Sequence, residues 1–153
     1  MVATSDDRVA VVTLDETLAA EHTVNNLHRH CPELPIFARS RSGKDSLVLE
    51  LASNDGYQLR NYHARGIPVL GIDPAEGPAR AAEKIGVPTL NTFFTLDLAK
   101  ELSEQGKAAD VIHGNNVLAH VADTNGFVAG IGNLLKPDGV AVIEAPYVKD
   151  LID

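Results

Sequence analysis

The sequence predicts an α/β fold, a doubly wound and mostly parallel sheet with helices on both faces. Short apolar runs rich in β-branched residues recur along the chain, and each is followed by a segment with helical spacing. Glycines directly follow several of these helical segments, as expected at helix ends. Strands that alternate with helices favour parallel pairing, with both sheet faces covered. The 153 residues, 44% of them hydrophobic, suffice for one core, so we predict one domain over residues 1–153.

Residues 1–45 are predicted to form a strand–helix–strand unit. Val9–Leu14 is a β-branched run typical of a buried strand, and Asp15 can cap the helix that follows. Prolines bracket the end of this helix, and Ile36–Arg39 is predicted to be the second strand.

From residue 46 onward the alternation becomes regular. Strands are predicted over residues 47–51, 69–72, 87–94, 109–112 and 140–143, and helices over residues 57–65, 78–85, 97–105 and 127–135.

The charge balance argues against two classes of partner. The chain has 13 basic and 21 acidic residues, a formal net charge of −8. Binding to nucleic acid or to an anionic membrane depends on basic patches, so we expect neither partner. No apolar run approaches the roughly 20 residues of a membrane span, and the N-terminus has no signal-peptide pattern. We therefore expect a cytoplasmic protein, with its oligomeric state open.

The only cysteine, Cys31, excludes an internal disulfide and a multi-cysteine zinc site. His28, His30 and Cys31 form an H-x-H-C cluster, but residues two apart on a helix point in different directions. We expect no metal site and no zinc. His113 is expected to be a packed histidine.

The candidate binding residues lie where the predicted parallel strands end, which is where such sheets bind ligands. Glu50 ends one strand, and the turn after it finishes at Gly56. Asp73 ends the next strand, at a spacing typical of a carboxylate that accepts hydrogen bonds from ribose hydroxyls. Asn115 and Asn116 end the fourth strand of this segment, with side chains that both donate and accept.

The turn "LELASNDG" is not the G-x-G-x-x-G pattern that seats a pyrophosphate. S-adenosyl-L-methionine carries adenosine without a phosphate and has a zwitterionic methionine end, so it suits the pattern better than NAD. In another interpretation, Ser53, Asn54 and Asp55 cap the helix predicted to start near Tyr57. The two roles are compatible.

Residues 46–153 resemble the core of the class I adenosylmethionine-dependent C-methyltransferases that act on nucleotide-linked keto-deoxysugars. The matching stretches, in the family's order, are "LVLELASNDG", "GIPVLGIDPA", "IGVPTLNTFF", "ADVIHGNNVLAHV", "LLKPDGVAVIEAPY" and "KDLID".

The resemblance implies a binding role for each candidate residue, with S-adenosyl-L-methionine or S-adenosyl-L-homocysteine as the cofactor. Residues 50–56 would line its methionine side, with Ser53 and Gly56 closest. Asp73 would hold the ribose hydroxyls, and Pro74 would shape the rim. Phe93 and Phe94 would lie beside the adenine. Asn115 and Asn116 would border the methionine end, and Asn116 and His120 would face the sugar.

The chain departs from this family in three ways. Ala52 stands where the family usually has glycine. The family's cysteine-rich zinc module has no counterpart, and its Tyr-His-Glu-His segment would follow Glu144–Tyr147, beyond Asp153. His120 is then the only nearby candidate for the base that removes a proton alpha to a ketone. We therefore expect cofactor binding with little or no methyl transfer by this chain.

The N-terminal piece resembles a different family. Residues 8–42 are similar to the second half of the RCK-type nucleotide-binding domain that regulates potassium channels and cation–proton antiporters. The half of that domain with the glycine-rich dinucleotide fingerprint has no counterpart in this sequence, so the resemblance does not imply NAD binding. We interpret the chain as a chimera joined near residues 43–46, with the extra strands extending a sheet edge. The alternatives are a recombined or engineered scaffold without a ligand, and a regulatory nucleotide-sensing module.

Overall fold

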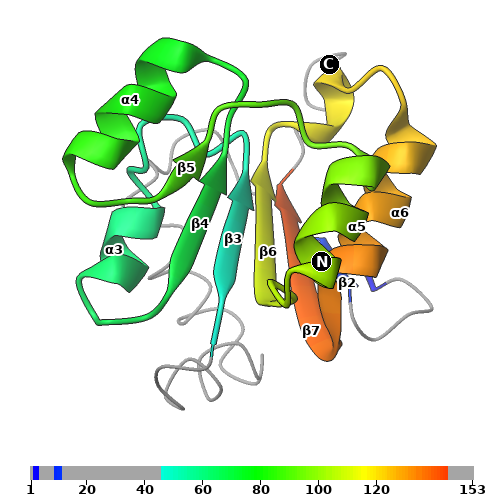
Figure 1. The fold of residues 1–153 in the computed structure, drawn as a ribbon. Coiled ribbons are helices and arrows are strands. Elements are labelled where there is room, and N and C mark those ends of the chain that lie inside the picture. The colour runs from blue at the N-terminus through cyan, green and yellow to red at the C-terminus, as the bar shows by residue number, and fades with distance from the viewer. Residues whose placement is uncertain (1, 4–8, 12–45, 145–153) are drawn as a thin grey trace.

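The computed structural model describes residues 2–3, 9–11 and 46–144, which form a seven-stranded sheet with helices on both faces (Figure 1). The predicted α/β class is confirmed. The elements are β1 (Val2–Ala3), β2 (Val9–Val11), β3 (Val48–Leu51), α3 (Leu59–His63), β4 (Val69–Ile72), α4 (Glu76–Lys84), β5 (Thr89–Leu90), α5 (Leu96–Glu104), β6 (Ala109–Asn115), the 3-10 helix η1 (Leu118–His120), α6 (Thr124–Leu134) and β7 (Leu135–Glu144).

The strand order across the sheet is β1-β2-β7-β6-β3-β4-β5. All neighbours pair in parallel except β1 and β2. The chain runs outward from β3 through β4 to β5, then returns to the other side of β3 as β6 and β7. The point where the order reverses therefore lies between β3 and β6, and open parallel sheets bind ligands at such a switch point.

The N-terminal strand extends the sheet edge beside β7, as expected from the sequence. In this pairing Val9 lies opposite Ala141, and Val11 lies opposite Ile143. The rest of the predicted strand–helix–strand unit, residues 12–45, lies outside the described residues, as does the H-x-H-C cluster.

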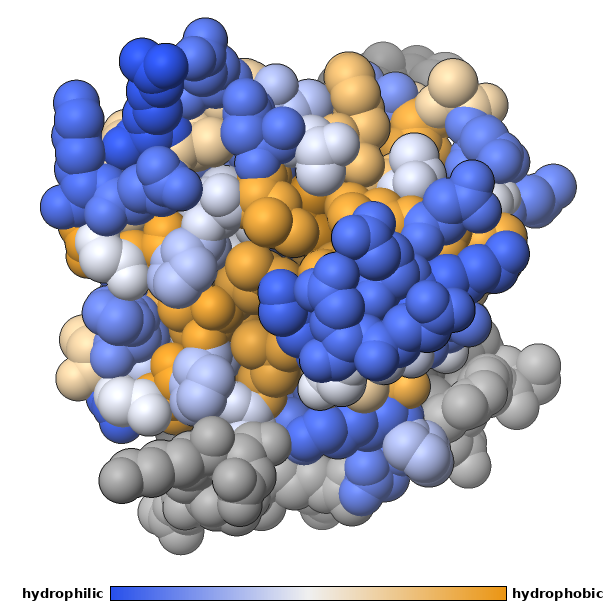
Figure 2. All heavy atoms as spheres, viewed as in Figure 1, coloured by the Kyte–Doolittle hydropathy of each residue, from blue (hydrophilic) through white to orange (hydrophobic). Residues whose placement is uncertain are grey.

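Alternate residues of β3, β4, β6 and β7 pack into two separate cores, one on each face of the sheet. Val48, Val111 and Val142 face α3 and α4, whereas Leu49, Ile112 and Ile143 face α5 and α6. In the view of Figure 2, the solvent faces of α4 and α5 are hydrophilic, and apolar surface lies between them over β3 and β4. Side chains at alternate positions of a strand therefore belong to different sides of the molecule.

Element boundaries differ from the prediction mainly where turns replace regular structure. The helix predicted from residue 57 begins at Leu59, and the extended segment 87–94 contains only the two-residue β5. β6 continues to Asn115, three residues past its predicted end. Leu135 pairs with Ala109, and Val140 pairs with Val111, so the pairing register shifts across residues 136–139.

No helix within the described part of the chain is long and apolar enough to cross a membrane.

Candidate cofactor-binding site

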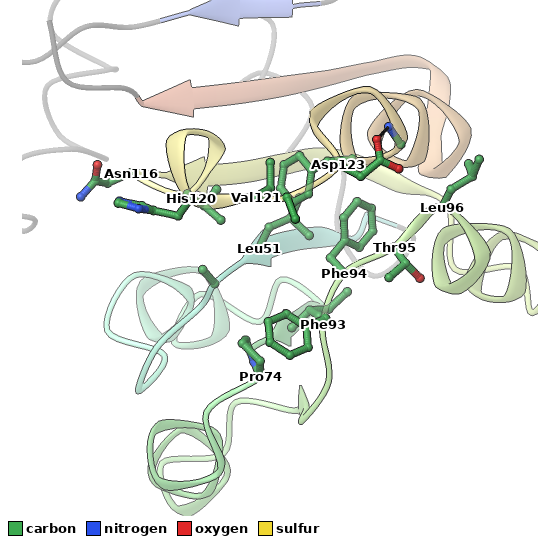
Figure 3. Close-up of a pocket in the computed structure, with 16 residues that line it drawn as sticks. Leu51, Pro74, Phe93, Phe94, Thr95, Leu96, Asn116, His120, Val121 and Asp123 are labelled. Atoms are coloured by element: carbon green, nitrogen blue, oxygen red, sulfur yellow. Dashed lines mark hydrogen bonds between the residues drawn. The ribbon is translucent and has the colours of Figure 1, made fainter. Parts of the chain in front are cut away.

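A cavity of about 540 Å³ opens at the carboxyl ends of β3, β4 and β6 (Figure 3). It lies at the switch point of the sheet, and most of its lining side chains are apolar. The lining residues are Leu51, Ala52, Ile72, Pro74, Phe93, Phe94, Thr95, Leu96, Asn116, Val117, His120, Val121, Ala122, Asp123, Gly126 and Phe127. A mostly apolar pocket with a few polar groups at its edge is typical of small-molecule sites.

Five of the residues predicted from the sequence line this cavity: Pro74, Phe93, Phe94, Asn116 and His120. The Phe94 ring meets Phe127 edge to face, with ring centroids 5.3 Å apart. Phe93 is 73% exposed, so it lines the cavity at its mouth. Asn116 and His120 lie together on one side of the pocket in Figure 3, away from Asp123. His120 is exposed and belongs to η1, which directly follows β6.

The turn after β3 requires an unusual backbone. Ala52, Asn54 and Gly56 have φ values of +57°, +54° and +76°. Glycine adopts such values without steric cost, whereas the Cβ of alanine opposes them. The glycine expected at position 52 from the family resemblance therefore has a physical basis, and Ala52 holds the same conformation under strain.

Gly56 has a packing role in addition to its backbone role. A Cβ atom at Gly56 would lie 3.2 Å from the Cβ atoms of Ala82 and Val87, closer than most real contacts. Its Cα thus faces α4 and Val87, two residues before β5, and Gly56 does not line the cavity.

Asp73 joins the end of β4 to this turn. One carboxylate oxygen accepts a hydrogen bond of 2.8 Å from the backbone N–H of Asn54, and the other accepts one of 2.8 Å from Ala75. Asp73 is 6% exposed. An ionised carboxylate has about four acceptor positions. Asp73 can therefore accept further hydrogen bonds next to Pro74, at the rim of the cavity.

Helix capping accounts for little of the polar character of the turn between β3 and α3. The N-cap residue of α3 is Gln58, and it makes no side-chain capping bond. Asp55 Oδ1 accepts a 3.3 Å hydrogen bond from the backbone N–H of Tyr57, which stabilises the turn locally. Ser53 is fully buried, and Asn54 and Asp55 are exposed.

A buried group of polar side chains lies between α3 and the sheet, and we name it the α3-face polar cluster. Its members are Glu50, Gln58, Tyr62, His113 and Asn115. Glu50 lies directly opposite His113 across β3 and β6. The Tyr62 hydroxyl is 2.9 Å from His113 Nε2, and the Asn115 side-chain amide donates to Gln58 Oε1.

Burial controls the protonation of this cluster. It raises the pKa of Glu50 well above its ordinary value, and the charges of Asp55 and Asp73 raise it further. Burial alone lowers the pKa of His113 to about 4. His113 is fully buried in the interior of β6, so it is the packed histidine that the sequence suggested.

Sequence reasoning missed Gln58 and Tyr62 as members of this cluster. Tyr62 falls three residues after Leu59 and so shares its apolar helix face, but nothing in that pattern shows that His113 is its partner. Among the described residues, no group of three or more His, Cys, Asp or Glu side chains is placed to hold a metal ion.

The fold and the site define a class of proteins, the doubly wound domains that bind a small molecule at the switch point of a parallel sheet. A family model described as "Methyltransferase domain" matches residues 49–141, more than half of the chain. The chain therefore belongs to the methyltransferase domain family.

Similar proteins include C-methyltransferase NovU of Streptomyces niveus, 34% identical over 106 residues. That alignment covers 69% of this chain and 25% of NovU. The ubiquinone biosynthesis O-methyltransferase of Azorhizobium caulinodans is 28% identical over 111 residues, or 69% of this chain and 43% of that protein. This chain thus spans less than half the length of either relative.

Solved structures of methyltransferases share the fold. A TehB-like SAM-dependent methyltransferase from Corynebacterium glutamicum has a TM-score of 0.55 at 21% identity, over 80% of this chain and 68% of that one. The plantazolicin methyltransferase BpumL, solved in complex with SAH, has a TM-score of 0.55 at 14% identity, over 79% of this chain and 51% of that one.

Proposed function

We propose that residues 46–144 form the cofactor-binding core of a methyltransferase that uses S-adenosyl-L-methionine. The observation that carries this proposal is the placement of Asp73. Its buried carboxylate lies next to Pro74 at the rim of an apolar cavity and holds the turn after β3 through Asn54. In the proposed complex, adenine occupies the apolar cavity beside Phe94, and the ribose hydroxyls donate to Asp73.

Isothermal titration calorimetry with S-adenosyl-L-homocysteine tests this proposal. The variant Asp73→Asn retains one carbonyl acceptor and the size of the side chain, and should weaken binding about tenfold by loss of a charged hydrogen bond. Asp97→Asn, on the exposed first turn of α5, is the matched control and should bind as the wild type does. Absence of heat at millimolar ligand, with folded protein, would contradict the proposal and favour a scaffold without a ligand.

We further propose that the methyl acceptor is a carbon atom of a nucleotide-linked keto-deoxysugar. The support is the 34% identity with a C-methyltransferase and the family resemblance of residues 46–153. His120 would remove the proton alpha to the ketone, next to Asn116 at the same side of the cavity.

Little or no transfer is expected of this chain, so transfer of a labelled methyl group to such a sugar is measured with excess enzyme, and wild-type transfer must be detected before the variants are compared. His120→Gln should reduce the transfer rate at least a hundredfold, the usual contribution of a general base, with unchanged affinity for the cofactor product. His63→Gln, on the exposed face of α3, serves as the control. Equal rates for the two variants would exclude His120 as the base.

We also propose that residues 1–45 belong to the same domain, joined near residues 43–46 to the methyltransferase core. The parallel pairing of β2 with β7 supports this arrangement. A chain that starts at residue 46 should then melt at a lower temperature than the full chain, because β7 loses its neighbour. An unchanged melting temperature would contradict the shared domain.

A further inference from the structure

Gly130 lies within α6, in a regular helix that disfavours glycine. α6 has two glycines beyond its first turn, the buried Gly130 and the exposed Gly132. Neither has a positive φ value, so alanine could adopt the same backbone at both positions. Alanine forms helices better than glycine does, because glycine loses more conformational freedom on folding. A glycine at a buried helix position therefore calls for an explanation from its surroundings.

The two glycines differ in what surrounds them. A Cβ atom at Gly130 would lie 3.0 Å from Cε1 and 3.1 Å from Cζ of Phe94, closer than most real contacts. At Gly132 the same atom would meet nothing within 4 Å among the described residues. The lack of a side chain at Gly130 is thus what lets the Phe94 ring lie directly on the backbone of α6.

The packing around the Phe94 ring leaves it one direction in which to yield. On the α6 side, Phe127 meets the ring edge to face, with an interplanar angle of 85° and centroids 5.3 Å apart. Ala99 of α5 lies beside the same point, with its Cβ atom 3.5 Å from the Cβ position of Gly130. Phe94 is half-buried and lines the cavity, whereas Gly130 and Ala99 do not. A methyl group at position 130 would therefore move the ring away from α6 and into the cavity.

We propose that Gly130 is a positioning residue, which seats the Phe94 ring against α6 and thereby sets how much of the cavity is open to a ligand. This inference rests on the proposed cofactor function, in which adenine lies beside Phe94. Gly130 itself touches no ligand and acts only through the ring. A poor helix former at this position is then the consequence of keeping room for the adenosine group.

The test compares Gly130→Ala with Gly132→Ala, which makes the same change in the same helix at an exposed position. The ligands are S-adenosyl-L-homocysteine and 5′-methylthioadenosine, since both carry the adenosine group. In calorimetry, Gly130→Ala should weaken binding of both about tenfold, the scale expected when one methyl group overpacks a close-packed site. Gly132→Ala should bind both ligands as the wild type does.

The variant Phe94→Leu separates an effect through the ring from an effect on the helix. Leucine lacks the ring atoms that the new methyl group would meet, so Gly130→Ala should cause no further loss of affinity in a Phe94→Leu background. Ligand-free melting temperatures should follow the same pattern. With Phe94 present, Gly130→Ala should raise the melting temperature less than Gly132→Ala does, and with Phe94→Leu the two changes should raise it equally.

Unchanged affinity of Gly130→Ala for both ligands would overturn the inference while cofactor binding stands. An equal loss of affinity with and without the Phe94 ring would overturn it too, because Gly130 would then act by another route. If Gly130→Ala does not fold, the double variant with Phe94→Leu must fold for the inference to stand. If wild-type protein binds neither ligand, the cofactor proposal fails and this inference fails with it.

Discussion

The Tyr62 hydroxyl lies 2.9 Å from Nε2 of His113, across the interface between α3 and the sheet. The two rings are tilted by 42° with centroids 5.7 Å apart, and both side chains are almost completely inaccessible to solvent. The tautomer of the neutral imidazole sets the direction of this hydrogen bond: Tyr62 donates to a bare Nε2, and a protonated Nε2 donates to the Tyr62 oxygen. A second proton would place a positive charge on an imidazole that is fully buried, and burial disfavours that charge.

Stability should therefore fall in mild acid because of His113. Its pKa is about 4 in the folded protein, against an ordinary value of 6.5. Below pH 6.5 the unfolded chain binds the proton first, so the free energy of unfolding decreases as the pH falls toward 4, by about 3 kcal/mol in total. His113→Asn should flatten this dependence in urea unfolding at pH 7, 5.5 and 4.5. His63→Asn, on the exposed face of α3, should leave the slope unchanged, and equal slopes for all three proteins would contradict the assignment.

Glu50 should have the opposite effect on stability. Its pKa is raised in the folded state by burial and by the charges of Asp55 and Asp73, so the folded protein holds this proton more tightly than the unfolded chain. The free energy of unfolding then declines as the pH rises from the unfolded pKa through the folded one. Glu50→Gln should raise the ligand-free melting temperature at pH 8 and have little effect at pH 4.

The same Glu50→Gln variant should bind S-adenosyl-L-homocysteine about tenfold more weakly at pH 8, because it removes the carboxylate that the family resemblance places at the methionine side of the cofactor. Calorimetry and thermal melts on the same samples test both effects. A variant that is less stable at pH 8 and binds normally would show that Glu50 is a structural residue.

Replacement of Ala52 by glycine should stabilise the protein. Relief of the left-handed strain at φ +57° is worth about 1 to 2 kcal/mol, and the greater flexibility of glycine in the unfolded chain offsets roughly half of this. Ala81→Gly, in the middle of α4, should instead destabilise the protein by about 1 kcal/mol. Urea unfolding of the two variants measures both effects, and loss of stability in both would show that Ala52 is not strained.

Replacement of the two phenylalanines near the cavity by alanine should have different effects on stability and on ligand affinity. Phe94→Ala removes a half-buried ring that packs against Phe127 and should cost about 2 kcal/mol of stability. It should weaken S-adenosyl-L-homocysteine and 5′-methylthioadenosine equally, because both carry adenine. Phe93→Ala removes a ring that is 73% exposed and should change stability by less than about 0.5 kcal/mol. If Phe93→Ala has the larger effect on ligand affinity, adenine lies at the mouth of the cavity.

The sequence alone was enough to predict the fold class and much of the rim of the cavity. Strand and helix periods depend on neighbours within a few residues, so the apolar runs and the glycines after helices could be recognised directly. The rule that ligands bind at the carboxyl ends of parallel strands then selected Asn116, and the family resemblance added Pro74 and Phe94; all three line the cavity.

Only the tertiary structure decided which residues behind this rim face one another. Gln58 and Asn115 are 57 residues apart in the chain, and Glu50 meets His113 only because β6 returns to the side of β3 opposite β4. The bond between the Asn54 N–H and Asp73, and the positive φ of Ala52, likewise depend on how β3 and β4 are joined and aligned. Local sequence periods specify which face of an element is apolar. Strand order and register depend instead on packing over the whole chain, and this order and register determine which polar side chains meet.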